Sequence, residues 1–170
     1  MDREILRTER LVLRELVPED VDSMHEVLGD PETMRFYPHP FSRDETAAWI
    51  ERNRERYAEY GFGLWGLELL ETGALVGDCG LTMQRVDGAL DVEVGYHLNR
   101  SYWHQGLATE AATACRDRAF GVLGLDRLIA IILPQNLPSQ GVARRIGMEI
   151  EKEADHAGWR HLIFSMRKPL

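Results

Sequence analysis

The sequence predicts an α+β protein with a mixed β-sheet, and three observations lead to this fold class. Runs of alternating or continuous apolar residues, typical of strands, recur from the N-terminal to the C-terminal part of the chain. Three of these runs follow one another through short turns, as antiparallel strands do. The remaining runs are separated by segments with helical caps and helical periodicity. With 170 residues, the chain fits a single domain over 1–170.

The first third of the chain predicts a strand, a helix and a helical turn. Apolar and polar residues alternate over Leu11–Leu16, which indicates a strand. A helix is expected over Pro18–Leu28, because Pro suits a first helical turn and Gly29 suits a C-terminal cap. The segment Asp30–Phe36, DPETMRF, is typical of a further short helical turn.

The clearest helix covers the segment FSRDETAAWIERNRERYAEYG. Ser42 and Glu45 have the spacing of a capping box, and Gly61 supplies the end of the helix. Three strands follow, and the last of them has the sequence ALDVEVGYHL. Their two connections are predicted at Glu71-Thr72-Gly73 and Asp87-Gly88.

The last third of the chain alternates helices and strands. A helix is expected over Leu107–Leu123, whose apolar residues recur at helical spacing. LDRLIAIIL follows as a buried strand, and LPSQGVARRIG follows as a short helix that Gly147 ends. WRHLIFSMRK is the final predicted strand.

Composition argues against several classes of function. The formal net charge of −8 argues against nucleic acid as a partner, because phosphate neutralisation needs a basic face. No run of about 18 apolar residues occurs, so no membrane-spanning segment is predicted. Cys79 and Cys115 form neither a metal-ligand spacing nor a disulfide framework, so no metal site is expected. Because the N-terminus also lacks the pattern of a signal sequence, a cytoplasmic protein is expected.

Two glycine-containing segments compare differently with phosphate-binding loops. Gly61–Gly66, GFGLWG, matches G-x-G-x-x-G, but a helix precedes it and a strand follows, the reverse of a dinucleotide-binding unit. Ser101–Ala111, SYWHQGLATEA, has the required order, because it follows a strand and opens a helix with a positive end. Gly106 and Ala108 leave room for a phosphate on the backbone amides. The alternative is a tight turn in which the small residues only permit packing.

The segment WHQGLATEA resembles the acetyl-CoA loop of the GNAT superfamily of N-acetyltransferases, whose motif is (Q/R)-x-x-G-x-(G/A). Trp103 stands where Gln or Arg is usual, a departure common in the ribosomal-protein N-terminal acetyltransferase (RimJ/RimL-like) branch. Four more segments resemble that branch in the same order: TERLVLREL, GLWGLELLETGALVGDCGL, EVGYHL and PQNLPSQGVARRIGM. The resemblance runs from about Leu6 to Lys168. It implies the GNAT fold, a mixed, mostly antiparallel sheet flanked by helices and splayed between the fourth and fifth strands.

The resemblance implies acetyl-CoA as the acetyl donor and assigns residues to its parts. Backbone amides of the loop are expected to bind the pyrophosphate, namely those of Gln105, Gly106, Leu107, Ala108 and Thr109. The pantetheine is expected along the fourth strand, at Tyr96, His97 and Leu98. Asn136 matches an asparagine that contacts the cofactor. Three arginines could offset phosphate charge, although surface arginines are commonly only solvated: Arg100, Arg144 and Arg145.

Glu93 is the candidate general base. Strand alternation places it on one face of the fourth strand with Asp91, Gly95 and His97. Glu93 matches the glutamate of E-x-G-Y that often serves as a base in this superfamily, commonly through water. The alternative is a solvent-facing strand carboxylate without a chemical role. Asp91 is closer to the hairpin turn and is expected to be structural.

A proton donor to the leaving thiolate is expected at a different position from the usual one. Many superfamily members carry a tyrosine seven residues after the asparagine, where this chain has Ala143. Ser139 matches a serine proposed for that role in the RimL-like branch. Its alternatives are a helix N-terminal residue or a simple cofactor contact. Neither cysteine is needed for an acyl-enzyme, so direct attack of the acceptor on acetyl-CoA is expected.

The acceptor is expected to be an amine. The branch resemblance favours the N-terminal α-amine of a protein, and a small-molecule amine is the other class. An α-amine with a pKa of about 7.7–8.0 costs about 1–1.4 kcal/mol to deprotonate at pH 7, whereas a lysine costs about 4.6 kcal/mol. Tyr37, His39 and Trp65 are candidate walls of the acceptor pocket, with plain loop or strand packing as the alternative.

Two other functions compete with N-acetyl transfer. A non-catalytic acetyl-CoA-binding regulatory module is suggested by the missing tyrosine and predicts cofactor binding without transfer. A protein-interaction domain that kept the fold predicts no affinity for coenzyme A. Many relatives form dimers, so the resemblance is also compatible with a homodimer.

Overall fold

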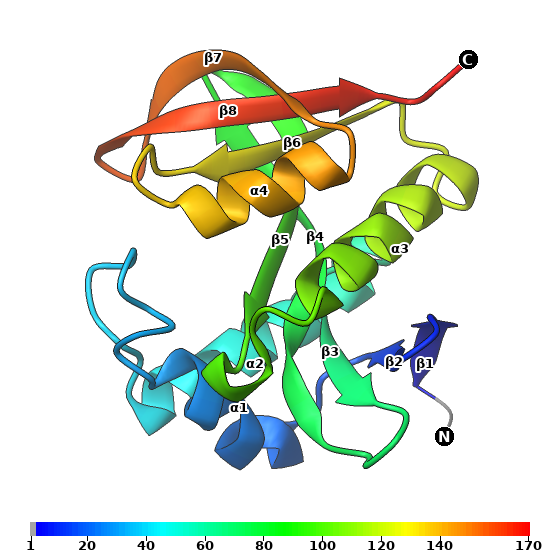
Figure 1. The fold of residues 1–170 in the computed structure, drawn as a ribbon, viewed down its shortest axis with the longest axis vertical. Helices are drawn as coiled ribbons and strands as arrows, with labels where there is room; N and C mark the ends of the chain where they lie inside the picture. The colour runs from blue at the N-terminus through cyan, green and yellow to red at the C-terminus, as the bar shows by residue number, and fades with distance from the viewer. Residues whose placement is uncertain (1–2) are drawn as a thin grey trace.

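The structure, a computed structural model, describes residues 3–170. The helices are α1 (Val21–Leu28), α2 (Arg43–Tyr60), α3 (Leu107–Gly121) and α4 (Leu137–Arg145). The strands are β1 (Glu4–Arg7), β2 (Leu11–Arg14), β3 (Leu64–Leu69), β4 (Leu75–Val86), β5 (Ala89–Leu98), β6 (Arg127–Ile132), β7 (Glu149–His156) and β8 (Trp159–Arg167). Two short 3-10 helices, η1 (Pro18–Asp20) and η2 (Arg100–Tyr102), complete the order. The predicted α+β class is confirmed (Figure 1).

Eight strands of the described chain form one sheet in the order β1-β2-β3-β4-β5-β6-β8-β7. Neighbouring strands are antiparallel except β5 and β6, which run parallel and share one residue pair, Glu93 with Ile129. β5 nevertheless stays paired with β4 as far as Leu98. The two halves of the sheet therefore separate beyond Glu93 (Figure 1). β5 and β6 are the fourth and fifth strands of the sequence prediction, so the predicted splay is confirmed.

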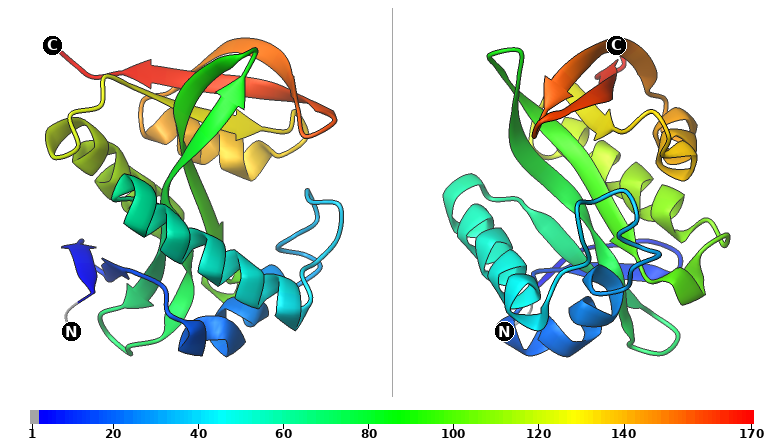
Figure 2. Two further views of the ribbon diagram at one scale, coloured as in Figure 1. Left: turned by 180° about the vertical axis from the view of Figure 1, so that it is seen from behind. Right: turned by 90° about the vertical axis from the view of Figure 1, so that its left-hand side faces the viewer.

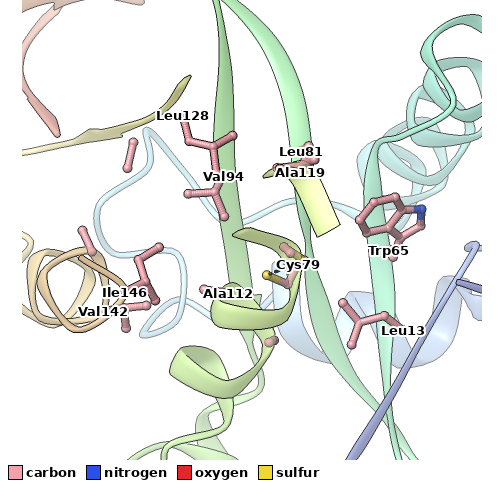
Figure 3. Packing of buried hydrophobic residues seen from close by; sticks show 14 of the residues in the cluster. Leu13, Trp65, Cys79, Leu81, Val94, Ala112, Ala119, Leu128, Val142 and Ile146 are labelled. Carbon is pink, nitrogen blue, oxygen red and sulfur yellow. Dashed lines mark hydrogen bonds between the residues drawn. The ribbon is translucent and has the colours of Figure 1, made fainter. Parts of the chain in front are cut away.

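Helices cover both faces of the sheet. α3 packs against one face, where Ala112 and Cys115 meet Cys79 and Val94 in the main core (Figure 3). α4 adds Val142 and neighbouring residues to the same core beside β6. α1 and α2 cover the opposite face (Figure 2). Their buried residues form a second cluster with the segments around them: Leu16, Met24, Val27, Leu28, Met34 and Ile50.

Local sequence signals explain several element boundaries. The Ser42 hydroxyl accepts from the Glu45 amide at 3.1 Å, and a Glu45 carboxylate oxygen accepts from the Ser42 amide at 3.0 Å, which is the predicted capping box. Gly61 ends α2 in the left-handed conformation, at φ 77°. Asp87 and Gly88 both have positive φ, 49° and 79°, as a two-residue hairpin turn between β4 and β5 requires.

The structure also differs from the prediction at the edges of the sheet. β1 and β7 were not expected, because neither carries a clear run of apolar residues. β7, EIEKEADH, is mostly exposed at one edge, and an edge strand needs few buried side chains. The helix expected from Pro18 begins as a 3-10 turn and is α-helical only from Val21. Within residues 3–170, no helix has both the length and the apolar character needed to cross a bilayer.

Candidate functional site

The N-terminus of α3 presents bare backbone amides. Gly106, the N-cap residue, has φ 81°, and His104 is also left-handed, with φ 63°. In the part of the chain described, no side chain caps this helix. The amides of Leu107, Ala108 and Thr109 belong to the first turn, where an α-helix offers no acceptor of its own. The loop can therefore bind an anion through its backbone, as its sequence predicts.

A hydrogen-bond cluster from the N-terminal strands holds this loop. The Glu110 carboxylate accepts from the Thr8 hydroxyl at 2.7 Å and from the Arg10 backbone amide at 2.8 Å. Arg10 Nε donates to the same carboxylate at 2.8 Å, and Arg10 Nη1 donates to the Gln105 carbonyl at 2.9 Å. Burial raises the pKa of Glu110, but the hydrogen bonds from Thr8 and Arg10 outweigh it and lower the pKa overall. No sequence signal pointed to this cluster, because its members lie about 100 residues apart.

Tyr96 and the start of α4 meet across the opening between β5 and β6. The Tyr96 hydroxyl donates to the Ser139 carbonyl at 2.8 Å and lies 2.9 Å from the Ser139 hydroxyl. Asn136 is the N-cap of α4, and its side-chain oxygen accepts from the Ser139 amide at 3.2 Å. Three residues predicted at the cofactor or the reaction are thus brought together. The contact of the Tyr96 hydroxyl with Ser139 was not foreseen.

Glu93 lies where β5 and β6 make their one pairing. Its carboxylate accepts from the Ile131 backbone amide at 3.2 Å. The Thr82 hydroxyl and the Gln84 side-chain amide, both on β4, donate to it at 3.3 Å. Burial raises the pKa of Glu93 to about 7, and these three hydrogen bonds act in the opposite direction. The carboxylate is therefore balanced between its two protonation states near neutral pH, which suits a general base.

His97 belongs to a buried hydrogen-bonded chain. Its Nδ1 lies 2.7 Å from Asp78, and its Nε2 lies 2.6 Å from the Tyr37 hydroxyl. The other oxygen of Asp78 accepts from Trp49 Nε1 at 2.9 Å. Burial alone lowers the pKa of His97, but the charge and hydrogen bond of Asp78, aided by Glu93, raise it overall. This series of hydrogen bonds connects the loop that carries Tyr37 to β4 and β5.

These contacts restrict how the predicted pantetheine residues can act. The side chain of His97 points to the α2 face, toward Asp78 and Tyr37, and away from Tyr96. The Leu98 carbonyl accepts from Trp103 Nε1 at 2.8 Å. Only the backbone of His97 can therefore contact a cofactor in the opening. The sequence analysis expected His97 to line the pantetheine without this restriction.

The three predicted acceptor-side residues end in different places. Tyr37 keeps 43% of its surface exposed, while its hydroxyl end lies against His97, and burial there raises its pKa. His39 is exposed and pairs with Glu45 at 2.8 Å. The structure corrects the prediction for Trp65, whose side chain is 1% exposed and packs in the core (Figure 3). The strand register puts Trp65 on the face of Cys79 and Tyr96, opposite Glu93, so it cannot line an acceptor pocket.

Two of the candidate phosphate arginines already have partners. Arg100 lies 3.4 Å from Asp30. Arg144 lies over the Phe164 ring at 5.2 Å and donates to Gln140. Among the described residues, Arg145 forms no hydrogen bond or ion pair with the α3 loop, and its positive charge acts on Tyr96.

The buried cysteines have no sign of nucleophilic activation. Cys79 and Cys115 lie with their sulfur atoms 3.6 Å apart in the core. Burial raises the pKa of Cys79, which keeps its thiol protonated. Among the residues that the structure describes, no cluster of three or more His, Cys, Asp or Glu residues could hold a metal ion.

The sequence and the structure are both similar to those of known acetyltransferases. Residues 10–149 match the family model described as acetyltransferase (GNAT) domain. YkkB, an uncharacterized protein of Bacillus subtilis (strain 168), is 34% identical over 148 residues, which are 86% of each chain. The crystal structure of an acetyltransferase from Agrobacterium tumefaciens str. C58 has a TM-score of 0.84 at 29% identity, covering 96% of this chain and 94% of that chain. A Vibrio cholerae structure, described provisionally as a ribosomal-protein-serine acetyltransferase, has a TM-score of 0.81 at 26% identity and covers 99% of this chain and 100% of that chain.

Proposed function

Because this chain belongs to the GNAT acetyltransferase family, we propose that it acetylates the N-terminal α-amine of a protein. GNAT acetyltransferases use acetyl-CoA as the acetyl donor and act on amine acceptors. The observation that carries the proposal is Glu93, a partly buried carboxylate with its pKa raised to about 7 where β5 and β6 separate.

Two features of the described chain fit acetyl-CoA. The uncapped first turn of α3 offers the amides of Leu107, Ala108 and Thr109 to a pyrophosphate, and the helix end is positive. The opening between β5 and β6 leaves backbone of β5 beyond Glu93 without a partner strand on that side. Acetyl-CoA supplies an acetyl group activated as a thioester. The residues of the chain hold the pyrophosphate, orient the acceptor and move protons.

Glu93 accepts a proton from the acceptor amine, directly or through one water. With a pKa of about 7, it lies within about one unit of an α-amine at about 7.7–8.0. Transfer of a proton from such an amine to Glu93 costs about 1 kcal/mol, whereas transfer from a lysine at about 10.4 costs about 4.6 kcal/mol. This difference favours α-amines over lysine side chains as acceptors.

As the amine nitrogen bonds to the acetyl carbon and the carbon–sulfur bond breaks, Ser139 donates its hydroxyl proton to the leaving thiolate. Glu93 releases the proton that it took from the amine to solvent, and Ser139 regains a proton from solvent. Its hydroxyl lies 2.9 Å from the Tyr96 hydroxyl, which in turn donates to the Ser139 carbonyl. This arrangement leaves the Ser139 hydroxyl and the Tyr96 hydroxyl in one hydrogen-bonded pair at the mouth of the opening. Burial raises the pKa of Tyr96, so the pair stays protonated at neutral pH.

The RimJ/RimL-like branch supports a protein acceptor. The five sequence segments described above resemble this branch, and the Vibrio cholerae relative carries a ribosomal-protein-serine description. Tyr37, on the loop between α1 and α2, is the acceptor-side residue with the strongest support, because it reaches the Glu93 face through His97. A small-molecule amine is the competing acceptor class.

A peptide assay tests the acceptor. A peptide with a free N-terminus and one internal lysine is incubated with acetyl-CoA and protein, next to the same peptide with its N-terminus blocked. Mass spectrometry is expected to find the acetyl group on the α-amine, and the blocked peptide is expected to stay unmodified. Acetylation of the lysine, or of small amines alone, contradicts the proposed acceptor. Acetyl-CoA binding measured by calorimetry without transfer to any amine supports a regulatory module instead.

A further inference from the structure

Two arginines of α2 lie against one tryptophan, which contacts His97 on the strand of the predicted base. The guanidinium carbons of Arg52 and Arg56 are each 5.8 Å from the centre of the Trp49 ring. Trp49 is itself fixed, because its Nε1 donates to Asp78 and its ring meets His97 edge-on at 5.6 Å. The two positive charges are thus held on the α2 face of the sheet, the face that carries Glu93.

α2 crosses the back of the sheet, the side on which Glu93 and His97 lie. Trp49 contacts His97 near the end of β5. Two turns later the Tyr57 hydroxyl donates to the Leu64 carbonyl, and Leu64 pairs through β4 with Gly95. α2 therefore begins near the His97 end of β5 and crosses the back of the sheet toward β3 (Figure 2).

The face of β5 between Glu93 and His97 lacks a side chain at Gly95. Gly95 lies on the same strand face as Glu93 and His97, and it contributes no side chain. A Cβ atom placed on Gly95 would meet only one side chain, the Leu64 methyl at 3.7 Å, which is ordinary contact. No side chain of Gly95 therefore separates Glu93 from His97 on this face.

The charges of these arginines are not neutralised within the described chain. The other two arginines of α2 are paired, Arg43 with Asp22 at 2.9 Å and Arg54 with Glu51 at 2.7 Å. Neither Arg52 nor Arg56 has a carboxylate within 4.0 Å among residues 3–170; Arg56 donates one hydrogen bond, to the Asn53 side-chain oxygen at 3.1 Å.

The energetics of Arg56 agree with a position near Glu93. Burial lowers the pKa of Arg56, and the nearby charge of Arg52 lowers it further. The carboxylate of Glu93 acts in the opposite direction. Each guanidinium group presents a planar fork of N–H donors that suits a carboxylate.

We propose that Arg52 and Arg56 bind a carboxylate of the acceptor, close to the amine that Glu93 deprotonates. This inference rests on the proposed function and names its preferred substrates. The carboxylate belongs either to the side chain of an acidic N-terminal residue or to the α-carboxyl group of a free amino acid. The competing account is that both arginines only shield Trp49 and are solvated.

Matched acceptors and matched variants test the inference. The acceptors are Asp-Ala-Ala-amide against Asn-Ala-Ala-amide, and free alanine against alaninamide. The proteins are wild type, Arg52→Gln, Arg56→Gln and the control Arg54→Gln, which removes the same charge from a residue of the same helix that pairs with Glu51. The readouts are kcat/KM for acetyl transfer and calorimetric binding of the acetylated peptides, which does not require turnover.

Wild type is expected to prefer the acidic member of one pair, and that pair identifies the source of the carboxylate. Arg56→Gln is expected to lower kcat/KM for that acceptor about tenfold to hundredfold and to leave the neutral acceptor within about threefold, because a charged hydrogen bond is lost. Arg54→Gln is expected to match wild type. Binding of N-acetyl-Asp-Ala-Ala-amide is expected to weaken in parallel if the peptide pair is the preferred one.

Two results of the transfer assay overturn the inference, and a third comes from calorimetry. Equal transfer to acidic and neutral acceptors by wild type does so while the proposed function stands. An equal loss for both acceptors in Arg56→Gln also does so, because it indicates a general structural role. If no acceptor is acetylated, the proposed function fails, and calorimetry then tests the arginine site by itself. Binding that depends on the carboxylate and is abolished by Arg56→Gln supports a carboxylate site at these arginines. Absence of such binding refutes the site.

Discussion

Glu93→Gln is expected to remove the base while keeping the shape of the site. The amide has the size of the carboxylate, and its oxygen can still accept from the Ile131 amide. With a pKa of about 7, Glu93 is about nine-tenths ionised at pH 8 and about one-tenth ionised at pH 6. Wild-type kcat/KM is therefore expected to change nearly tenfold over this range from Glu93 alone. At pH 8 the variant is expected to be about 10²–10⁴-fold slower.

The same substitution has a predicted effect on stability. Because burial raises the pKa of Glu93 from 4.5 to about 7, the folded protein holds a proton that the unfolded chain has already lost. The free energy of unfolding is thus expected to fall as pH rises between about 4.5 and 7. The fall in unfolding free energy over this pH range amounts to about 3 kcal/mol at most. Glu93→Gln escapes this loss, so it is expected to melt above wild type at pH 8 and close to it near pH 4.5.

The assay compares kcat/KM of wild type and variant from pH 6 to 9 with one peptide acceptor. Their ratio isolates Glu93, because the acceptor amine titrates identically in both reactions. Asp91→Asn is the control, since it makes the same change two residues away on the same face of β5, where Asp91 pairs with Arg127 at 3.0 Å. A ratio that stays constant from pH 6 to 8 refutes Glu93 as the base. A variant less stable than wild type at pH 8 refutes the burial argument.

Three further substitutions test other parts of the structure. Asp78→Asn is expected to lower the free energy of unfolding in urea by about 3–5 kcal/mol, because it leaves buried His97 without its charged partner. Because Asp78 raises the pKa of His97, the stabilisation from this pair is present below about pH 6.5 and is lost as pH rises through the pKa of His97 in the folded protein. An equal loss of unfolding free energy in Asp78→Asn at pH 6 and pH 9 contradicts the pairing. Ser42→Ala removes the N-cap oxygen of α2 and is expected to cost about 1 kcal/mol, a fall of about 2–4 °C in Tm; an unchanged Tm contradicts the capping box. Gly106→Ala places a Cβ at φ 81° and is expected to cost about 1–2 kcal/mol and weaken acetyl-CoA binding in calorimetry; unchanged affinity argues against the α3 loop as the pyrophosphate site.

Features governed by nearby residues were predictable from the sequence alone. The capping box of Ser42 and Glu45, the end of α2 at Gly61 and the turn at Asp87-Gly88 each depend on backbone geometry within a few residues. The strand-to-helix turn at Gly106 belongs to the same class. The order of the motifs along the chain then indicated the family, the fold and the separation of β5 from β6. Each motif corresponds to one local backbone geometry, and the family arranges these geometries in a fixed order.

Only the tertiary structure decided which side chains meet. The hydrogen bonds of His97 with Asp78 and Tyr37 depend on the register of β4 with β5 and on a loop 60 residues away. Trp65 is buried because α3 covers the face of β3 on which it lies. The alternation of residues within a strand cannot reveal which face a helix covers. Strand and helix periodicity establishes which residues share a face, whereas the environment of that face is set by elements far away in the sequence. For this reason Glu93 could be named as a candidate from its motif, but its raised pKa and its influence on Arg56 required the packed fold.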